Sequence, residues 1–208
     1  MNNYNPNIHH RRSIRLKGYD YSQAGLYFIT ICTKDRKCLF GKIVVGVDDV
    51  RVENFQSRQE MILNNAGKIA DRCWLEIPEH FPDAVLHEYI VMPNHVHGII
   101  ELKWDDSVRT SHVMSVPDNS DIPVGTSHVM SQRNHNQFSK PIPGSISVII
   151  QQYKSSVTRF VNKNNISHFR WQRNYYEHII RNKQSYEKIA DYIINNPKNW
   201  KEDNFFNE

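Results

Sequence analysis

The sequence predicts an α+β fold in which helices pack on one face of an antiparallel sheet. Short runs of β-branched and aromatic residues alternate with segments whose apolar residues recur every three or four positions, the patterns of strands and helices respectively. Only Pro93 and Asn94, both turn-forming residues, separate two of the strand-like runs. The chain of 208 residues is long enough for one hydrophobic core and short for two ordinary domains.

The coarse order of the elements is strand, helix, hairpin, insertion, helix, strand and helix. Strands are expected at 25–33, 42–47, 84–92, 95–102 and within 169–180, and helices at 58–74, 145–160 and 184–195. Pro78 and Pro82 should end the first helix, Ser145 should cap the second, and Pro197 follows the third. This order fits a ferredoxin-like or RNA-recognition-type antiparallel sheet with an extra C-terminal helix.

Two segments differ in composition from the rest of the chain. Residues 1–24 are rich in arginine, and we expect them to form a basic arm. Residues 104–140 are polar and contain the sequence Thr-Ser-His-Val-Met-Ser twice. Two copies are too few for a stacked repeat architecture, so we interpret this segment as a disordered insertion. The folded domain is therefore expected to comprise residues 25–103 and 141–200.

The formal net charge of +4 is mildly basic, and many of the basic residues gather in the C-terminal part of the chain. Clustered positive charge suits a polyanion, although such clusters are more often plain solvated surface. The candidates for contacts to nucleic-acid phosphates are Lys154, Arg159, Lys163, Arg170, Arg173 and Arg181. The neighbouring aromatic residues Phe169, Trp171 and Tyr175 could stack on unpaired bases.

The cysteines are odd in number and lack the close pairs of a disulfide framework or a structural zinc site. No apolar run approaches the roughly 20 residues that cross a bilayer. The polar first residues lack the apolar core of a signal peptide. We therefore expect a cytoplasmic protein without a membrane partner.

Two local patterns could carry chemistry. His95 and His97 are two apart on an expected strand, so both imidazoles face one side and could hold one metal ion. Alone, such a pair is more often two hydrogen-bonded structural histidines. Tyr192 and Asn196 are four apart on the last helix, so they share one side of it, away from the apolar stripe centred near Ile189.

Together these patterns resemble the single-tyrosine HUH transposases, and in particular the REP-associated tyrosine transposase branch. The resemblance is carried by Met-Pro-Asn-His-Val-His-Gly at 92–98 and Asp-Tyr-Ile-Ile-Asn-Asn-Pro at 191–197. It also includes residues 25–33 and the stretch from Trp171 to His178. It therefore spans most of the chain outside the basic arm and the insertion.

The resemblance implies a function and a set of site residues. Members nick and rejoin single-stranded or hairpin DNA through a 5′-phosphotyrosine intermediate. Carried over by position, the nucleophile is Tyr192 and the ligands of Mg²⁺ or Mn²⁺ are His95, His97 and Asn196, where family members often have glutamine in place of the asparagine. A phenol has a pKa near 10 and is a poor nucleophile at neutral pH, so it needs a neighbouring positive charge or a base.

Several alternatives stay open at this stage. Tyr175 and Tyr176 are competing tyrosines, although neither has a polar partner at helical spacing. The chain could instead be a DNA- or RNA-binding module without catalysis, or a phosphodiesterase that activates water rather than tyrosine. A homodimer is also compatible with the resemblance, because related single-tyrosine enzymes can pair their active sites.

Overall fold

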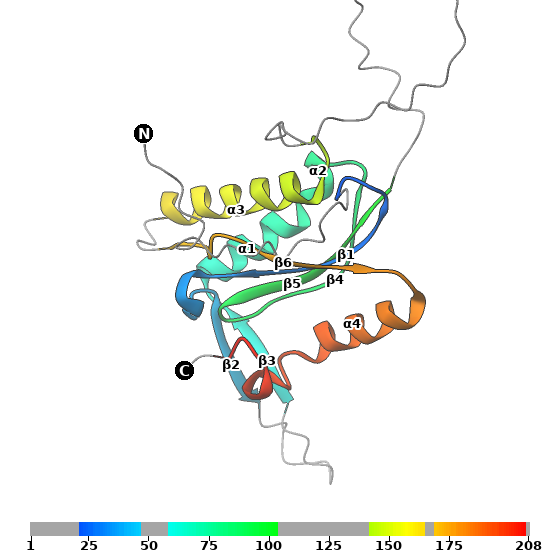
Figure 1. Ribbon diagram of the computed structural model, residues 1–208. Coiled ribbons are helices and arrows are strands. Elements are labelled where there is room, and N and C mark those ends of the chain that lie inside the picture. The colour runs from blue at the N-terminus through cyan, green and yellow to red at the C-terminus, as the bar shows by residue number, and fades with distance from the viewer. Residues whose placement is uncertain (1–20, 47–57, 104–141, 165–168, 207–208) are drawn as a thin grey trace, which may run out of the picture.

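The computed structural model describes residues 21–46, 58–103, 142–164 and 169–206. Its central sheet has four strands in the order β4-β5-β1-β6, and every neighbouring pair is antiparallel (Figure 1). The strands are β1 (Gly25–Cys32), β4 (Ala84–Val91), β5 (His95–Leu102) and β6 (Tyr176–Ile180). With one helix after β1 and another after β5, this is the βαββαβ plan of ferredoxin-like folds, so the predicted α+β class is confirmed.

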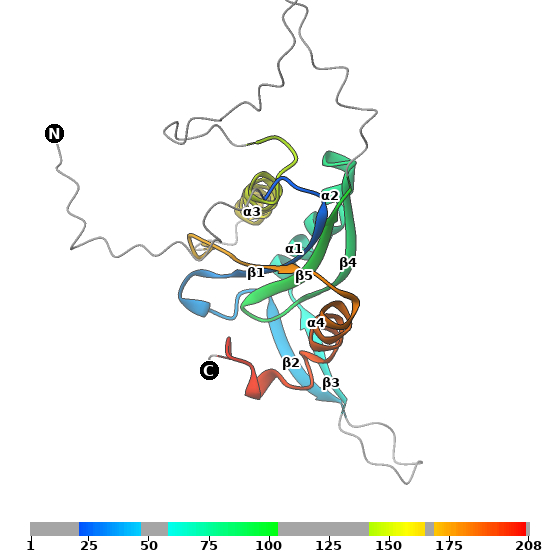
Figure 2. The same ribbon diagram turned by 45° about the vertical axis from the view of Figure 1, so that its right-hand side comes forward.

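Helices cover both faces of the sheet. On one face lie α1 (Asn65–Leu75) and α3 (Ile146–Lys163), over a core that includes Tyr27, Ile29 and Ile100. On the other face lies α4 (Lys183–Asn195), whose Ala190 and Ile193 bury a smaller cluster (Figure 2). The extra C-terminal helix expected from the sequence therefore occupies the face opposite the other two helices.

The segment expected to be one helix at 58–74 is a strand followed by a helix, and the prediction was wrong there. Residues Arg58–Leu63 form β3, which pairs with β2 (Gly41–Gly46) in a separate two-stranded ribbon. Helix α1 begins only at Asn65, after Asn64 accepts a hydrogen bond of 3.0 Å from the backbone N–H of Gly67. Met61 and Ile62 fit the helical spacing of the residues that follow, but pairing with β2 decides their conformation.

The helix ends also differ from expectation in two places. Pro78 does not simply end the first helix, because it lies in the first turn of a short helix α2 (Ile77–His80) that follows α1. Ser145 occupies the N-cap position of α3, but its hydroxyl makes no capping bond and lies 3.0 Å from the hydroxyl of Ser147. The basic arm and the insertion fall almost wholly outside the described residues. Among the helices that the structure describes, none has the length and apolar character to cross a membrane.

The chain continues past residue 200, the expected end of the folded domain, and returns to the sheet. A 3₁₀ helix, η3 (Trp200–Glu202), leads into residues 203–206. The backbone carbonyl of Phe205 accepts a 2.7 Å hydrogen bond from the side chain of Asn94, in the turn between β4 and β5. We call residues 200–206 the C-terminal segment. It places its side chains against the start of β5.

Strand β5 alternates between the two faces, and this alternation positions the histidines. Val96 and Ile100 belong to the core under α1 and α3, whereas Ile99 belongs to the cluster under α4. His95 and His97 share the face of Ile99, because side chains two apart on a strand point the same way. Between them and Ile99, Gly98 faces Trp74 of α1, and a Cβ at Gly98 would lie 2.3 Å from the indole ring.

We expect Gly98→Ala to lower the free energy of unfolding by about 1–3 kcal/mol, the usual cost of forcing a methyl group into a filled core. Urea unfolding would measure this. In a Trp74→Phe background the same substitution should cost less, because the phenyl ring lacks the atoms that a Cβ at Gly98 would meet. Equal costs in both backgrounds would contradict this account of the glycine.

Candidate active site

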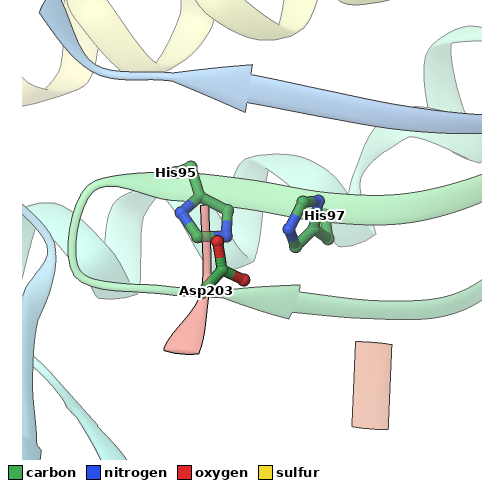
Figure 3. A group of neighbouring side chains, drawn as sticks. All are labelled: His95, His97 and Asp203. Carbon is green, nitrogen blue, oxygen red and sulfur yellow. The ribbon is translucent and has the colours of Figure 1, made fainter. Parts of the chain in front are cut away.

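The two imidazoles stand side by side on β5, with ring centroids 4.2 Å apart (Figure 3). Both are almost completely buried, at 0% and 1% exposure for His95 and His97. Burial lowers the pKa of His95 to about 3, with a smaller effect from Arg36, and it also holds the pKa of His97 well below its ordinary value, with His95 adding to the shift. Both rings are therefore neutral at physiological pH, the form in which histidine binds metals.

Each histidine is oriented by a hydrogen bond through its Nδ1. His95 Nδ1 lies 2.8 Å from the side-chain oxygen of Asn94, and His97 Nδ1 lies 2.8 Å from the hydroxyl of Thr30. Thr30 is the residue of β1 that pairs with His97 across the sheet, so strand register supplies this partner. His95 Nε2 is buried, and within the described part of the chain no group hydrogen-bonds to it.

Tyr192 reaches the histidines from α4. Its hydroxyl lies 3.2 Å from His97 Nε2 and donates a 2.9 Å hydrogen bond to Asp203 Oδ2. The ring packs edge-on against Phe28, and 39% of the residue is exposed. Burial, and next the hydrogen bond to Asp203, raise the pKa of the phenol above its ordinary value. The hydroxyl is therefore protonated and shares its proton with a carboxylate.

Asn196, one turn after Tyr192, is 1% exposed and occupies the C-cap position of α4. Its amide nitrogen donates a 2.6 Å hydrogen bond to Asp203 Oδ2. Its amide oxygen is buried and has no hydrogen-bond partner among the described residues. An unpartnered buried carbonyl oxygen is costly unless something else binds it.

Asp203 is the site residue that the sequence did not indicate. One ligand atom from each of His95, His97 and Asp203 lies within 4.8 Å of the other two, so the three could hold a metal ion (Figure 3). The residue stands eleven positions after Tyr192, beyond the last helix, in a segment without apolar periodicity. Its carboxylate is a possible metal ligand, but it comes near the two histidines only because the C-terminal segment folds back onto the sheet.

These donor atoms fit a divalent cation. His95, His97 and Asp203 offer two imidazole nitrogens and one carboxylate, a mixed set suited to Mn²⁺, and the amide of Asn196 hydrogen-bonds to that carboxylate. Among the donor atoms of these four residues, His95 Nε2 and the amide oxygen of Asn196 are buried without a hydrogen-bond partner in the described part of the chain. The structure thus brings together all four residues predicted for the site and adds Asp203.

The basic residues predicted to contact phosphates lie on other elements than the histidines and Tyr192. Arg159, Lys163, Arg170, Arg173 and Arg181 are exposed, on α3, on the segment before β6 and just before α4. Lys154 differs, because its ammonium donates a 2.6 Å hydrogen bond to the carbonyl of Gln172 and longer ones to the next two carbonyls. Burial lowers the pKa of Lys154 to about 8. This lysine holds the chain before β6 in place.

A cavity of about 630 Å³ lies between α3 and the segment that precedes β6. Arg159, Arg173, Trp171 and Tyr175 line it, together with Lys154. It therefore combines the cationic and aromatic side chains that single-stranded nucleic acids contact.

Comparison with known proteins identifies a relative of this chain, but that relative has no assigned activity. No protein-family profile matches the chain. A protein of Haemophilus influenzae is 39% identical over 203 residues, covering 98% of this chain and 97% of its own length. The chain belongs to the same family as this protein. The relative is described only as an uncharacterized protein, so family membership by itself assigns no reaction.

Among solved structures, a REP-associated tyrosine transposase bound to a REP hairpin is similar to this chain. The sequences are 16% identical, the TM-score is 0.47, and the match covers 89% of this chain and 74% of the other. At that identity and TM-score, neither fold nor activity transfers from one protein to the other.

We expect stability to fall as the pH drops from about 6.5 toward 3, since unfolded histidine takes up a proton near pH 6.5 and the folded His95 only near 3. The unfolded state then binds more protons, and one such histidine contributes about 1.4 kcal/mol per pH unit. Urea unfolding with a chelator present should give a shallower slope for His95→Gln than for the wild type. His178→Gln, at an exposed position on β6, is the control for the loss of a histidine outside the site. Equal slopes for wild type and His95→Gln would contradict the shift.

Proposed function

We propose that this chain is a metal-dependent DNA strand transferase that nicks and rejoins single-stranded or hairpin DNA, with Tyr192 as its nucleophile. This is the activity of the single-tyrosine HUH transposases, which the sequence resembles in the branch associated with REP elements. The proposal depends on one observation, the position of the Tyr192 hydroxyl beside the two histidines. This hydroxyl lies 3.2 Å from His97 Nε2, and the ring of His95 is next to that of His97. The cytoplasm is the compartment that such a reaction implies.

The residues that would hold the cation are His95 and His97, with Asn196 or Asp203 as the third ligand. When bound, Mg²⁺ or Mn²⁺ would supply positive charge at the scissile phosphate and at the oxygens that attack and leave. The protein keeps the imidazoles neutral and oriented, since both are buried and each is hydrogen-bonded through Nδ1.

In the proposed reaction, Tyr192 gives up a proton and Asp203 accepts it. The phenol already donates to the carboxylate over 2.9 Å, so Asp203 is placed to take the proton as the oxygen attacks phosphorus. Attack would form the tyrosine–phosphate bond and break the bond to the 3′ oxygen, which would take up the proton received by Asp203, leaving a 5′-phosphotyrosine and a free 3′-OH. A second 3′-OH could then attack the same phosphorus and release Tyr192, which rejoins a strand without a nucleotide cofactor.

Basic and aromatic side chains would supply the contacts to DNA. We propose that Arg159 and Arg173, in the cavity beside α3, contact phosphates while Trp171 and Tyr175 accept unpaired bases. Lys163, Arg170 and Arg181 are exposed and do not line this cavity, and we propose them as further contacts to the DNA backbone. Lys154 would contribute mainly by holding the wall of the cavity, because carbonyl groups already accept from its ammonium.

The competing functions differ from this one in a single product. A binding module would retain hairpin DNA without cutting it, and a phosphodiesterase would cut with water and leave no bond to protein. Only tyrosine attack produces a protein–DNA adduct that survives denaturation. Incubation with a hairpin oligonucleotide and Mn²⁺, followed by denaturing electrophoresis, is therefore the experiment that tests the proposed function.

Tyr192→Phe should abolish the adduct and leave hairpin binding within a fewfold of the wild type, because it removes the attacking oxygen and keeps the ring against Phe28. Tyr176→Phe is a matched control, since Tyr176 and Tyr192 are both 39% exposed. That variant should form the adduct normally. Survival of the adduct in Tyr192→Phe would assign the nucleophile to another residue.

Replacing both His95 and His97 by Ala should remove Mn²⁺-dependent cleavage while the protein still unfolds cooperatively. The imidazoles supply the ligand nitrogens at the site, and their loss leaves the cation with oxygen donors alone. Cleavage should also stop when the wild type is treated with excess chelator and return when Mn²⁺ is added. Cleavage that persists in chelator would refute the role of the metal.

The third ligand can be identified from Mn²⁺ affinity measured by electron paramagnetic resonance. We expect Asp203→Asn to raise the dissociation constant at least tenfold, because it replaces a charged carboxylate that lies within 4.8 Å of the histidine ligand atoms. Asn196→Ala should have the smaller effect. The opposite ranking would make Asn196 the third ligand, as the family resemblance implies.

A further inference from the structure

The side chain of Asn94 has only one orientation that its surroundings allow. Asn94 lies in the turn between β4 and β5 and is completely buried. Its amide nitrogen is 3.1 Å from the backbone carbonyl of Arg36 and 2.7 Å from that of Phe205. Both neighbours are acceptors, so the nitrogen must face them. The amide oxygen must therefore face His95, 2.8 Å from Nδ1.

This orientation determines where His95 carries its proton. A carbonyl oxygen cannot donate, so the hydrogen between the two groups must belong to His95 Nδ1. A second proton, on the buried Nε2, would find no acceptor among the described residues, so the ring carries its N–H on Nδ1 alone. Its Nε2 therefore has a free lone pair, and Nε2 is the atom without a hydrogen-bond partner in the described part of the chain.

The same amide also reaches Asp203 through one peptide group. Asn94 donates to the carbonyl of Phe205, and the backbone N–H of Phe205 donates a 2.6 Å hydrogen bond to Asp203 Oδ1. The other oxygen of Asp203 accepts from Tyr192 and Asn196. The Phe205 ring lies against His95, with centroids 4.9 Å apart. One side chain thus connects the turn before β5 to the C-terminal segment.

We propose that Asn94 is a positioning residue for the site, which fixes His95 in the tautomer whose Nε2 can bind a cation and secures the segment that carries Asp203. The inference rests on the proposed function in one respect, the binding of a cation by His95. The hydrogen-bond argument for the tautomer stands on the Asn94 contacts alone.

The tautomer is measured directly in metal-free protein labelled with ¹⁵N in its histidine rings. Long-range ¹H–¹⁵N correlation spectra distinguish a proton on Nδ1 from one on Nε2, and the signals that disappear in His95→Gln identify His95. The wild type should show His95 protonated on Nδ1. A wild-type spectrum with the proton on Nε2 would overturn the proposal without any variant of Asn94.

Two substitutions separate the acceptor of Asn94 from its donors. Asn94→Ala removes both, so His95 should lose its fixed tautomer and Mn²⁺ affinity should fall by about 10–100-fold, the usual effect of removing a group that orients a ligand. Asn94→Asp keeps an acceptor for Nδ1 and loses the amide donors. It should retain the Nδ1–H tautomer, whereas the amide of Phe205 should exchange its hydrogen faster than in the wild type.

Thr33→Val is the matched control. Thr33 follows directly after β1, and its buried hydroxyl lies 2.7 Å from the backbone carbonyl of Lys37 and 3.0 Å from that of Asn94, so it contacts the backbone of Asn94 and not its side chain. This variant should lose stability yet keep both the tautomer and the Mn²⁺ affinity. An unchanged His95 tautomer in Asn94→Ala would refute the positioning role, and so would an equal loss of Mn²⁺ affinity in Thr33→Val.

Different results would contradict the proposed function and the positioning role of Asn94. A wild-type protein that binds no Mn²⁺ and forms no adduct would end the proposal of a metal-dependent transferase. The ring spectra, recorded without metal, would still decide whether Asn94 sets the tautomer of His95.

Discussion

The pairing of β5 with β1 is the constraint on which the site depends. It places Thr30 opposite His97 and turns both histidines toward the face that α4 covers. A register shift of one residue would move both imidazoles into the core under α1 and α3. Gly98 secures the same register from the other side, because only a residue without Cβ fits against Trp74. The packing of Gly98 against Trp74 on one face of the sheet thus helps to fix the positions of His95 and His97 on the other face.

The sequence predicted the parts of this arrangement that local patterns encode. Strand alternation gave the shared face of His95 and His97, and helical spacing gave that of Tyr192 and Asn196. Residues 58–63 were assigned wrongly, because Met61 and Ile62 satisfy a helical spacing until pairing with β2 makes them a strand. That pairing is a tertiary contact, which no short window of sequence contains.

Asp203 escaped prediction for a related reason. Nothing in its neighbours marks it, and its position follows from contacts made by other residues, namely the bonds from Asn94 to Phe205 and from Phe205 to Asp203. Asn94 itself was read from the sequence only as a turn former. Its side chain gains a second role because the turn that it forms lies between the segment that follows β1 and the C-terminal segment.

The uneven exposure of the site has a consequence for substrate entry. The imidazoles and Asn196 are at most 1% exposed, whereas Tyr192 is 39% exposed. The rings of Phe28, Trp200 and Phe205 enclose the histidines. For the function proposed above, an incoming nucleic acid would therefore meet the phenol of Tyr192 before the buried imidazoles and Asn196.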